Sequence, residues 1–155
     1  MSTADHVLAA LRRRGETLAV AESLTGGLLA ATLVAVPGAS TVFRGGLVVY
    51  ATDLKVTLAG VPADLLAERG PVDGDVAAAL AAGARDRCGA DWGLATTGVA
   101  GPGAADGHPA GEVWIGLAGP GTATAVRHRF GGDRAAVRGA SVAAALELLA
   151  GAVTP

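Results

Sequence analysis

The sequence predicts one α/β domain over residues 1–155, a three-layer α/β/α arrangement whose mixed sheet includes a C-terminal hairpin. Apolar stretches of strand length alternate with segments of helical periodicity, which is typical of βαβ units with parallel strands. Near the C-terminus two such stretches flank Pro120–Gly121, and this indicates an antiparallel hairpin. Apolar residues make up 51% of the chain, enough to bury a core between sheet and helices.

The first part of the chain is expected to form helix, strand and helix. Residues 4–15 place apolar side chains at helical spacing and stop at Gly15, a typical C-terminal cap. A short strand follows over residues 16–23. An apolar helix over residues 28–36 then ends at Pro37.

The middle part is expected to hold one strand and three helices. Residues 45–51, GGLVVYA, form a β-rich run of the fully buried type. Thr52 can cap a short helix after it, and a second short helix begins near Pro62. Residues 73–89 predict a long helix with a polar start and a glycine at its stop.

The last part predicts the rest of the sheet and a closing helix. Residues 91–98 read as a buried strand, and residues 99–111 as a glycine-rich loop too polar for the core. Residues 112–119 and 122–130 form the hairpin. An amphipathic helix over residues 132–150 completes the domain.

Composition argues for a cytoplasmic protein without a membrane segment. The chain has no uninterrupted apolar run of about 18 residues, the length that a bilayer requires. Its first arginines follow the first apolar segment, the reverse of a secretory signal. A single cysteine excludes an internal disulfide and fits a reducing compartment. The apolar excess over so small a domain leads us to expect a homo-oligomer.

Charge, histidine spacing and the absence of known nucleotide motifs argue against nucleic acid, a metal and a cofactor as partners. A net charge of −2 and a pI of about 5.8 argue against direct binding of nucleic acid, which needs a basic face. His6, His108 and His128 lie far apart and lack metal-ligand spacing, so no metal is expected. The chain contains neither a P-loop nor a dinucleotide-binding glycine motif, and we expect no cofactor.

The stretch AESLTGG is the first candidate for chemistry, because it lies where a strand passes into a helix. Free amides at the helix start, near Thr25, Gly26 and Gly27, can hold an anion or an oxyanion. Ser23 can act as a nucleophile if a base stands beside it. The alternative is that serine and threonine only cap the helix, which is their commoner use.

The stretch TTGVAGPG is the second candidate. Thr97 and Gly98 leave a strand at the edge where ligands of open α/β sheets gather, and Gly101 follows in the loop. The alternative is a tight turn in which Gly98, Gly101 and Gly103 supply positive φ angles.

The third candidate contains the only tyrosine and the only lysine of the chain, Tyr50 and Lys55. Tyr50 is expected to end a strand, and Lys55 to lie on the next helical turn, so both can face one crevice. Burial can lower the pKa of a lysine until it accepts protons, whereas arginine stays charged. A site that needs a proton acceptor would therefore keep Lys55, although composition alone could also leave one lysine by chance.

Arg134 and Arg138 are the fourth candidate, four residues apart on one face of a helix start. Two guanidinium groups beside the positive end of a helix dipole can bind a phosphate. The alternative is a solvated face with Asp133 as the helix cap.

These segments, in this order, resemble the CinA C-terminal domain family, which includes the nicotinamide mononucleotide deamidases. The resemblance rests on four blocks that cover nearly the whole chain: VAESLTGGLLAATLVAVPGAS, FRGGLVVYATDLKVTLAGVPADLLAERGPV, ATTGVAGPGAADGHPAGEVWIGLAGP and RFGGDRAAVRGASVAAALELL. It implies a hydrolase that converts the linear amide of nicotinamide mononucleotide into nicotinic acid mononucleotide and ammonia, within pyridine nucleotide and NAD metabolism. The chain looks like the stand-alone form, without the family's additional N-terminal domain.

The resemblance also implies roles for the candidate residues. Ser23 would be the nucleophile, Lys55 would accept its proton in a dry pocket, and Tyr50 would orient the pair or relay a proton. Thr97, with backbone amides near Gly26 and Gly98, would hold the oxyanion. The nucleotide's phosphate would be anchored by Arg134 or Arg138 together with the helix start at Thr25–Gly27.

Three departures from the family pattern stand out: Leu24 replaces a usual cysteine, Ala51–Thr52 replaces Ser-Asn, and the loop over residues 99–111 is longer. Two non-enzymatic classes also stay open. One is a catalytically silent nucleotide-binding or regulatory module. The other is a structural partner in competence or recombination, which the family's competence-linked name suggests.

Overall fold

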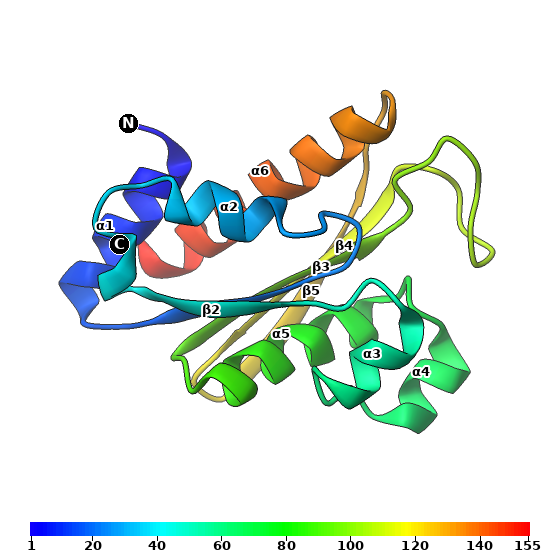
Figure 1. Cartoon of the computed structure of the whole chain (residues 1–155), viewed down its shortest axis with the longest axis horizontal. Helices are drawn as coiled ribbons and strands as arrows, with labels where there is room; N and C mark the ends of the chain where they lie inside the picture. The colour runs from blue at the N-terminus through cyan, green and yellow to red at the C-terminus, as the bar shows by residue number, and fades with distance from the viewer.

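The computed structural model describes residues 1–155 and shows a five-stranded mixed sheet with helices on both faces (Figure 1). Its strands are β1 (Leu18–Glu22), β2 (Phe43–Val48), β3 (Trp92–Gly98), β4 (Glu112–Gly119) and β5 (Thr122–Arg129). They lie in the order β2-β1-β3-β4-β5. The strand β1 is parallel to β2 and β3, whereas β4 is antiparallel to β3 and β5. The predicted α/β class and the C-terminal hairpin are therefore confirmed.

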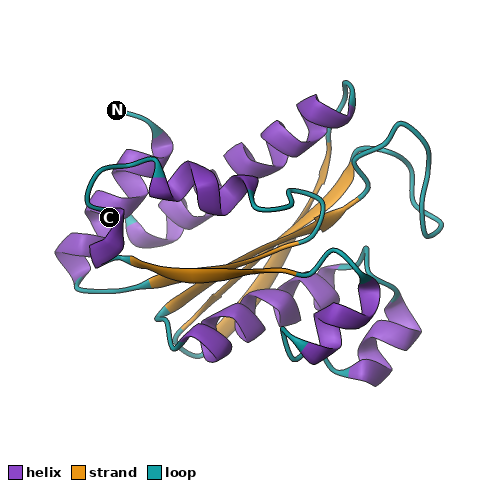
Figure 2. Cartoon of the chain, in the orientation of Figure 1, coloured by secondary structure: helices purple, strands orange, loops and turns teal.

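Two layers of helices enclose this sheet (Figure 2). One face is covered by α1 (Thr3–Arg14), α2 (Leu28–Val34) and α6 (Arg134–Val153). The other face carries α5 (Gly74–Cys88), with the short helices α3 (Thr52–Thr57) and α4 (Ala63–Arg69) beside it. A turn of 3-10 helix, η1 (Ala39–Thr41), precedes β2.

Each face of the sheet has its own core. The larger core contains Leu8, Leu29, Leu94, Ile115 and Leu149, which join α1, α2 and α6 to the sheet. The smaller core, against α5, is built largely from alanine and valine. Glycines at the sheet surface let α5 approach closely, because an added Cβ at Gly93 or Gly116 would collide with the carbonyl oxygen of Ala81 or Ala77.

The caps of the longer helices follow the sequence signals. Gly15 and Gly89 end α1 and α5 in the left-handed conformation, as predicted. Asp133 caps α6, and its carboxylate accepts a hydrogen bond from the amide of Ala136 at 2.9 Å. The predicted cap at Asp133 is thus confirmed.

The strand β2 differs from its prediction. It begins at Phe43 and ends at Val48, not at residue 51, and every second residue is exposed. The reason is its place at the sheet edge, where it pairs with β1 alone. Thr52 is the first residue of α3 and not its cap, since Ala51 occupies that position without a side-chain hydrogen bond.

By length and composition, α6 is apolar enough to cross a membrane. Its inner face, including Val137, Leu146 and Leu149, is buried in the larger core. A core helix of a globular domain has these same properties.

Candidate active site

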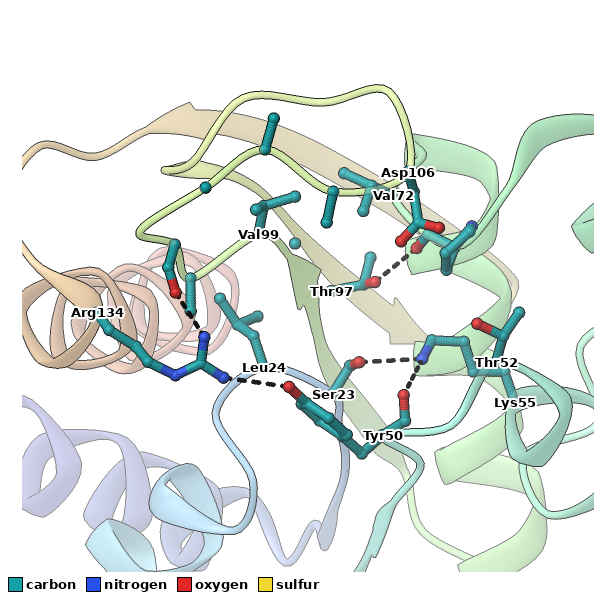
Figure 3. A pocket seen from close by; sticks show the side chains of 17 residues that line it. Ser23, Leu24, Tyr50, Thr52, Lys55, Val72, Thr97, Val99, Asp106 and Arg134 are labelled. Atoms are coloured by element: carbon teal, nitrogen blue, oxygen red, sulfur yellow. Dashed lines mark hydrogen bonds between the residues drawn. The ribbon is translucent and has the colours of Figure 1, made fainter.

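A cavity of about 340 Å³ opens at the carboxyl ends of β1 and β3 (Figure 3). This is the edge at which ligands of open α/β sheets bind. Several separate segments converge on it. The lining comprises Ser23, Leu24, Tyr50, Thr52, Lys55, Pro71, Val72, Thr97 to Gly101, Gly103 to Asp106 and Arg134.

Ser23 and Lys55 meet inside this cavity. The Lys55 Nζ lies 2.9 Å from the Ser23 Oγ, within hydrogen-bonding distance. Lys55 is 1% exposed and Ser23 7% exposed, so both groups are largely shielded from solvent. Ser23 follows β1 directly, and its amide donates to the carbonyl of Thr96 at 3.0 Å. The sheet ladder therefore fixes the backbone of the serine.

Three oxygens surround the lysine amine. Besides Ser23 Oγ, these are the carbonyl of Val49 at 2.7 Å and that of Tyr50 at 3.4 Å. A neutral amine has two hydrogens for the carbonyls and a lone pair for the serine hydroxyl. A protonated amine has three hydrogens for the same three oxygens. The amine therefore has hydrogen-bond partners in both charge states. A group that accepts a proton and later returns it needs such surroundings.

Burial lowers the pKa of Lys55 to about 8, because a charged ammonium loses its hydration there. The carboxylate of Asp106 acts in the opposite direction and raises this pKa. About a tenth of the lysine is therefore uncharged at pH 7, far more than for an exposed lysine with an ordinary pKa.

Glu22 was not singled out from the sequence, yet it organises the turn that follows β1. Its carboxylate is 1% exposed and accepts hydrogen bonds from the amides of Leu29 and Ala30 at 2.8 and 3.0 Å. It also accepts a hydrogen bond from the hydroxyl of Thr25 at 2.6 Å. The sequence did hold a signal for this role, because Glu22 is a lone acidic residue at the end of an apolar strand. A carboxylate that is buried there needs hydrogen-bond partners.

Because Glu22 occupies the start of α2, the predicted anion site there is wrong. The amides of Leu29 and Ala30 in the first turn of α2 bind this internal carboxylate, and the Gly26 amide donates to the Ser23 carbonyl at 3.1 Å. Thr25, Gly26 and Gly27 do not line the cavity. Thr25 is fully buried, and its hydroxyl also contacts the Thr96 hydroxyl at 2.8 Å.

The two arginines of α6 have separate positions. Arg138 donates to the carbonyls of Leu24 and Thr25, both at 2.9 Å, and does not line the cavity. It fixes the turn after Ser23. Arg134 does line the cavity, and donates to the carbonyl of Gly101 at 2.6 Å and to the hydroxyl of Tyr50 at 3.1 Å.

Tyr50 lines the cavity, but its hydroxyl is directed to Arg134 and not to Lys55 (Figure 3). Only its backbone carbonyl contacts the lysine amine. The side chain is 62% exposed. The Tyr50 hydroxyl therefore does not orient the Ser23–Lys55 pair, and a relay of a proton from Tyr50 to the departing ammonia stays a prediction.

Thr97, Gly98 and Gly101 also line the cavity. The Thr97 hydroxyl donates to the carbonyl of Pro71 at 2.6 Å, so its hydrogen is not free for an oxyanion. Gly101 has a φ of 92°, as the turn alternative predicted, whereas neither Gly98, which lies in β3, nor Gly103 has a positive φ. Gly98 is needed instead because a Cβ there would press on Glu112 and Val113 of β4.

Asp106 is a charged cavity residue that the sequence analysis missed. It stands in the loop between β3 and β4 with a φ of 52°, and Gly107 follows it. The dipeptide Asp-Gly, a strong turn signal, could have drawn attention to it. The structure contains no group of three or more His, Cys, Asp or Glu side chains suited to a metal ion.

A shielded hydroxyl in contact with an amine of lowered pKa can act as a nucleophile with its base. Such a pair can attack the carbonyl carbon of an ester or amide. The 2.9 Å contact lies within the range that direct proton transfer requires.

Comparison with known proteins places the chain in a family. Residues 1–153 match the model of the CinA C-terminal domain. A CinA-like protein of Frankia casuarinae is 53% identical over 143 residues, which cover 92% of this chain and 33% of that protein. A CinA-like protein of Geobacter sulfurreducens is 47% identical over 150 residues, covering 96% of this chain and 36% of that protein. The chain thus spans about a third of the length of these curated relatives.

Solved structures agree over nearly the whole fold. A CinA superfamily protein from Klebsiella pneumoniae 700603 superposes with a TM-score of 0.93 at 34% identity, covering 99% of this chain and 98% of that one. One from Escherichia coli gives a TM-score of 0.88 at 33% identity, covering 96% and 90%. The chain belongs to the CinA C-terminal domain family.

Proposed function

We propose that this protein is an amidase that hydrolyses nicotinamide mononucleotide to nicotinic acid mononucleotide and ammonia. The observation that carries the proposal is the contact between the Ser23 Oγ and the buried Lys55 Nζ at 2.9 Å. Cavity size and lining support a small-molecule substrate, since about 340 Å³ is within the range of ligand pockets.

The first half of the reaction forms an acyl-enzyme. Neutral Lys55 takes the Ser23 proton while Oγ bonds to the amide carbon, and a tetrahedral intermediate with a negatively charged oxygen results. When the C–N bond breaks, the Lys55 proton passes to the departing nitrogen, which leaves as ammonia. The lysine is then neutral again.

The second half returns the enzyme to its starting state. Lys55 takes a proton from water, and the resulting hydroxide oxygen bonds to the acyl carbon. The C–O bond to Ser23 breaks, the proton returns to the serine oxygen, and the carboxylic acid is released. Both halves use one amine, which the three surrounding oxygens hold in either charge state.

Backbone groups are available for the developing negative charge. The amide of Leu24, directly after Ser23 and at the cavity wall, donates to no acceptor in the protein. We assign the oxyanion to this amide rather than to the Thr97 hydroxyl, which already donates to Pro71. Arg134, at the opening of the same cavity, is assigned to the phosphate.

Ammonia release from nicotinamide mononucleotide tests the proposal. Ser23→Ala and Lys55→Met should each lower the rate about 10³-fold or more, as loss of a nucleophile or its base does. Ser40→Ala, an exposed serine on η1, is the matched control and should keep the rate. Circular dichroism checks that each variant folds.

An unchanged rate in either folded variant would remove that residue from the mechanism. Binding of the nucleotide to the unmodified protein with no ammonia release would instead favour the catalytically silent nucleotide-binding module.

A further inference from the structure

Three charged side chains line the cavity: Lys55, Asp106 and Arg134. In Figure 3 Arg134 and Asp106 lie on opposite sides of it, and Ser23 lies between them in this view. The cavity therefore offers a cation at one side and a carboxylate at the other, with the proposed nucleophile in the middle.

The position of Asp106 is built into its loop. Asp106 and Gly107 have φ angles of 52° and 80°, as in a tight two-residue turn. The flanking residues close this turn: Ala105 N donates to His108 O at 3.0 Å, and His108 N donates to Ala105 O at 2.9 Å. The His108 Nδ1 lies 2.7 Å from Oε2 of the buried Glu112 at the start of β4. The turn is thus tied to the sheet.

Asp106 lines the cavity and is exposed, so its carboxylate is open to a ligand. Its charge reaches the interior: burial lowers the pKa of Lys55, and the Asp106 carboxylate acts against that shift by favouring the charged amine. A protonated Lys55 would repel a cationic ligand, and Asp106 offsets that repulsion. A ligand with a positive group beside its reactive carbon therefore gains from this side chain.

We propose that Asp106 is a specificity-determining residue that selects carboxamides on a positively charged ring, an N-substituted pyridinium, over neutral aromatic carboxamides of the same shape. This inference rests on the proposed function, because it assigns the phosphate to Arg134 and the ring to Asp106. In nicotinamide mononucleotide the anionic phosphate and the cationic ring are separated by the ribose. The anionic phosphate would then face Arg134, and the cationic ring would face Asp106.

A pair of isosteric substrates tests the assignment. Nicotinamide mononucleotide carries the ring cation, and in benzamide riboside 5′-monophosphate a carbon atom replaces the ring nitrogen. Asp106→Asn should lower the ratio of kcat/KM for the cationic compound to kcat/KM for the neutral compound about tenfold. Asparagine tolerates a positive φ, so the turn is retained. Intrinsic reactivity and any change in Lys55 cancel when the two substrates are compared between variants.

Asp53→Asn is the matched control, because Asp53 is an exposed acid on α3 that does not line the cavity. It should leave the discrimination intact. Equal losses for both compounds in Asp106→Asn would overturn the proposal, since they would point to loop shape alone.

Calorimetry on Ser23→Ala separates this inference from the proposed chemistry. Tighter binding of the cationic compound, lost when Asp106→Asn is added, supports the selection even if the unmodified protein releases no ammonia. Equal binding of the two compounds, or no binding of either, overturns it.

Discussion

The amine of Lys55 must be uncharged before it can take the Ser23 proton. Its lowered pKa of about 8 then sets the pH dependence of the reaction. Only the neutral form of the base is active, so the rate of the reaction is proportional to the fraction of Lys55 that is neutral. Burial is the main cause of the shift, so this behaviour belongs to the folded site and not to lysine in general.

The value of kcat/KM should rise about tenfold per pH unit below pH 8 and level off above about pH 9. Initial rates of ammonia release between pH 6 and 9.5 provide the measurement, with circular dichroism at each pH to confirm folding. A rate that is flat over this range, or that falls as pH rises, would contradict Lys55 as the base.

Among the secondary-structure elements, β1 and α2 are joined by the carboxylate of Glu22. It fills the helix start with negative charge and satisfies two amides that would otherwise be buried without partners. The turn that carries Ser23 thus depends on a side chain that has no part in the proposed chemistry.

Glu22→Ala should lower the free energy of unfolding by about 3 kcal/mol, because it leaves buried donors unpaired. Glu22→Gln should cost less, since one amide oxygen still accepts a hydrogen bond. Urea denaturation measures both. Glu68→Ala, an exposed glutamate on α4, is the control and should stay within about 0.5 kcal/mol. A similar small change in Glu22→Ala would show that the cap is dispensable.

How much the sequence could predict also varies with the element. The positions of Ser23 and Lys55 were predictable, because each follows a strand whose carboxyl end must reach the same sheet edge. The partners of Thr97 and Arg138 were not, since Pro71 and the carbonyls after Ser23 are brought to them by tertiary packing. The role of Glu22 was not predictable for the same reason. The local sequence indicates only that a helix begins, and the fold is needed to show which group accepts hydrogen bonds from its first amides.

Over the whole molecule, the spacing of the layers depends on glycines between α5 and the sheet. Side chains there would separate the helix from β3 and β4. The close approach holds the segment before α5, including Pro71 and Val72, against the cavity.

Gly116→Ala should lower the free energy of unfolding by about 2 kcal/mol or more, because its Cβ would press on the backbone of α5. Gly45→Ala in β2 is the matched control, since nothing lies within 4 Å of an added Cβ there. Thermal or urea unfolding of the two variants gives the comparison. Equal effects at both positions would mean that helix and sheet can move apart freely.

The oxygens that hold the Lys55 amine in addition to Ser23 belong to the main chain, at Val49 and Tyr50. Every amino acid supplies such a carbonyl. A substitution at Tyr50 can therefore change a side chain that lines the cavity while both acceptors stay in place. The acceptors around the base depend on the path of the backbone and not on side chains. Substrate preference can therefore change through side-chain substitutions while the groups that hold the base are kept.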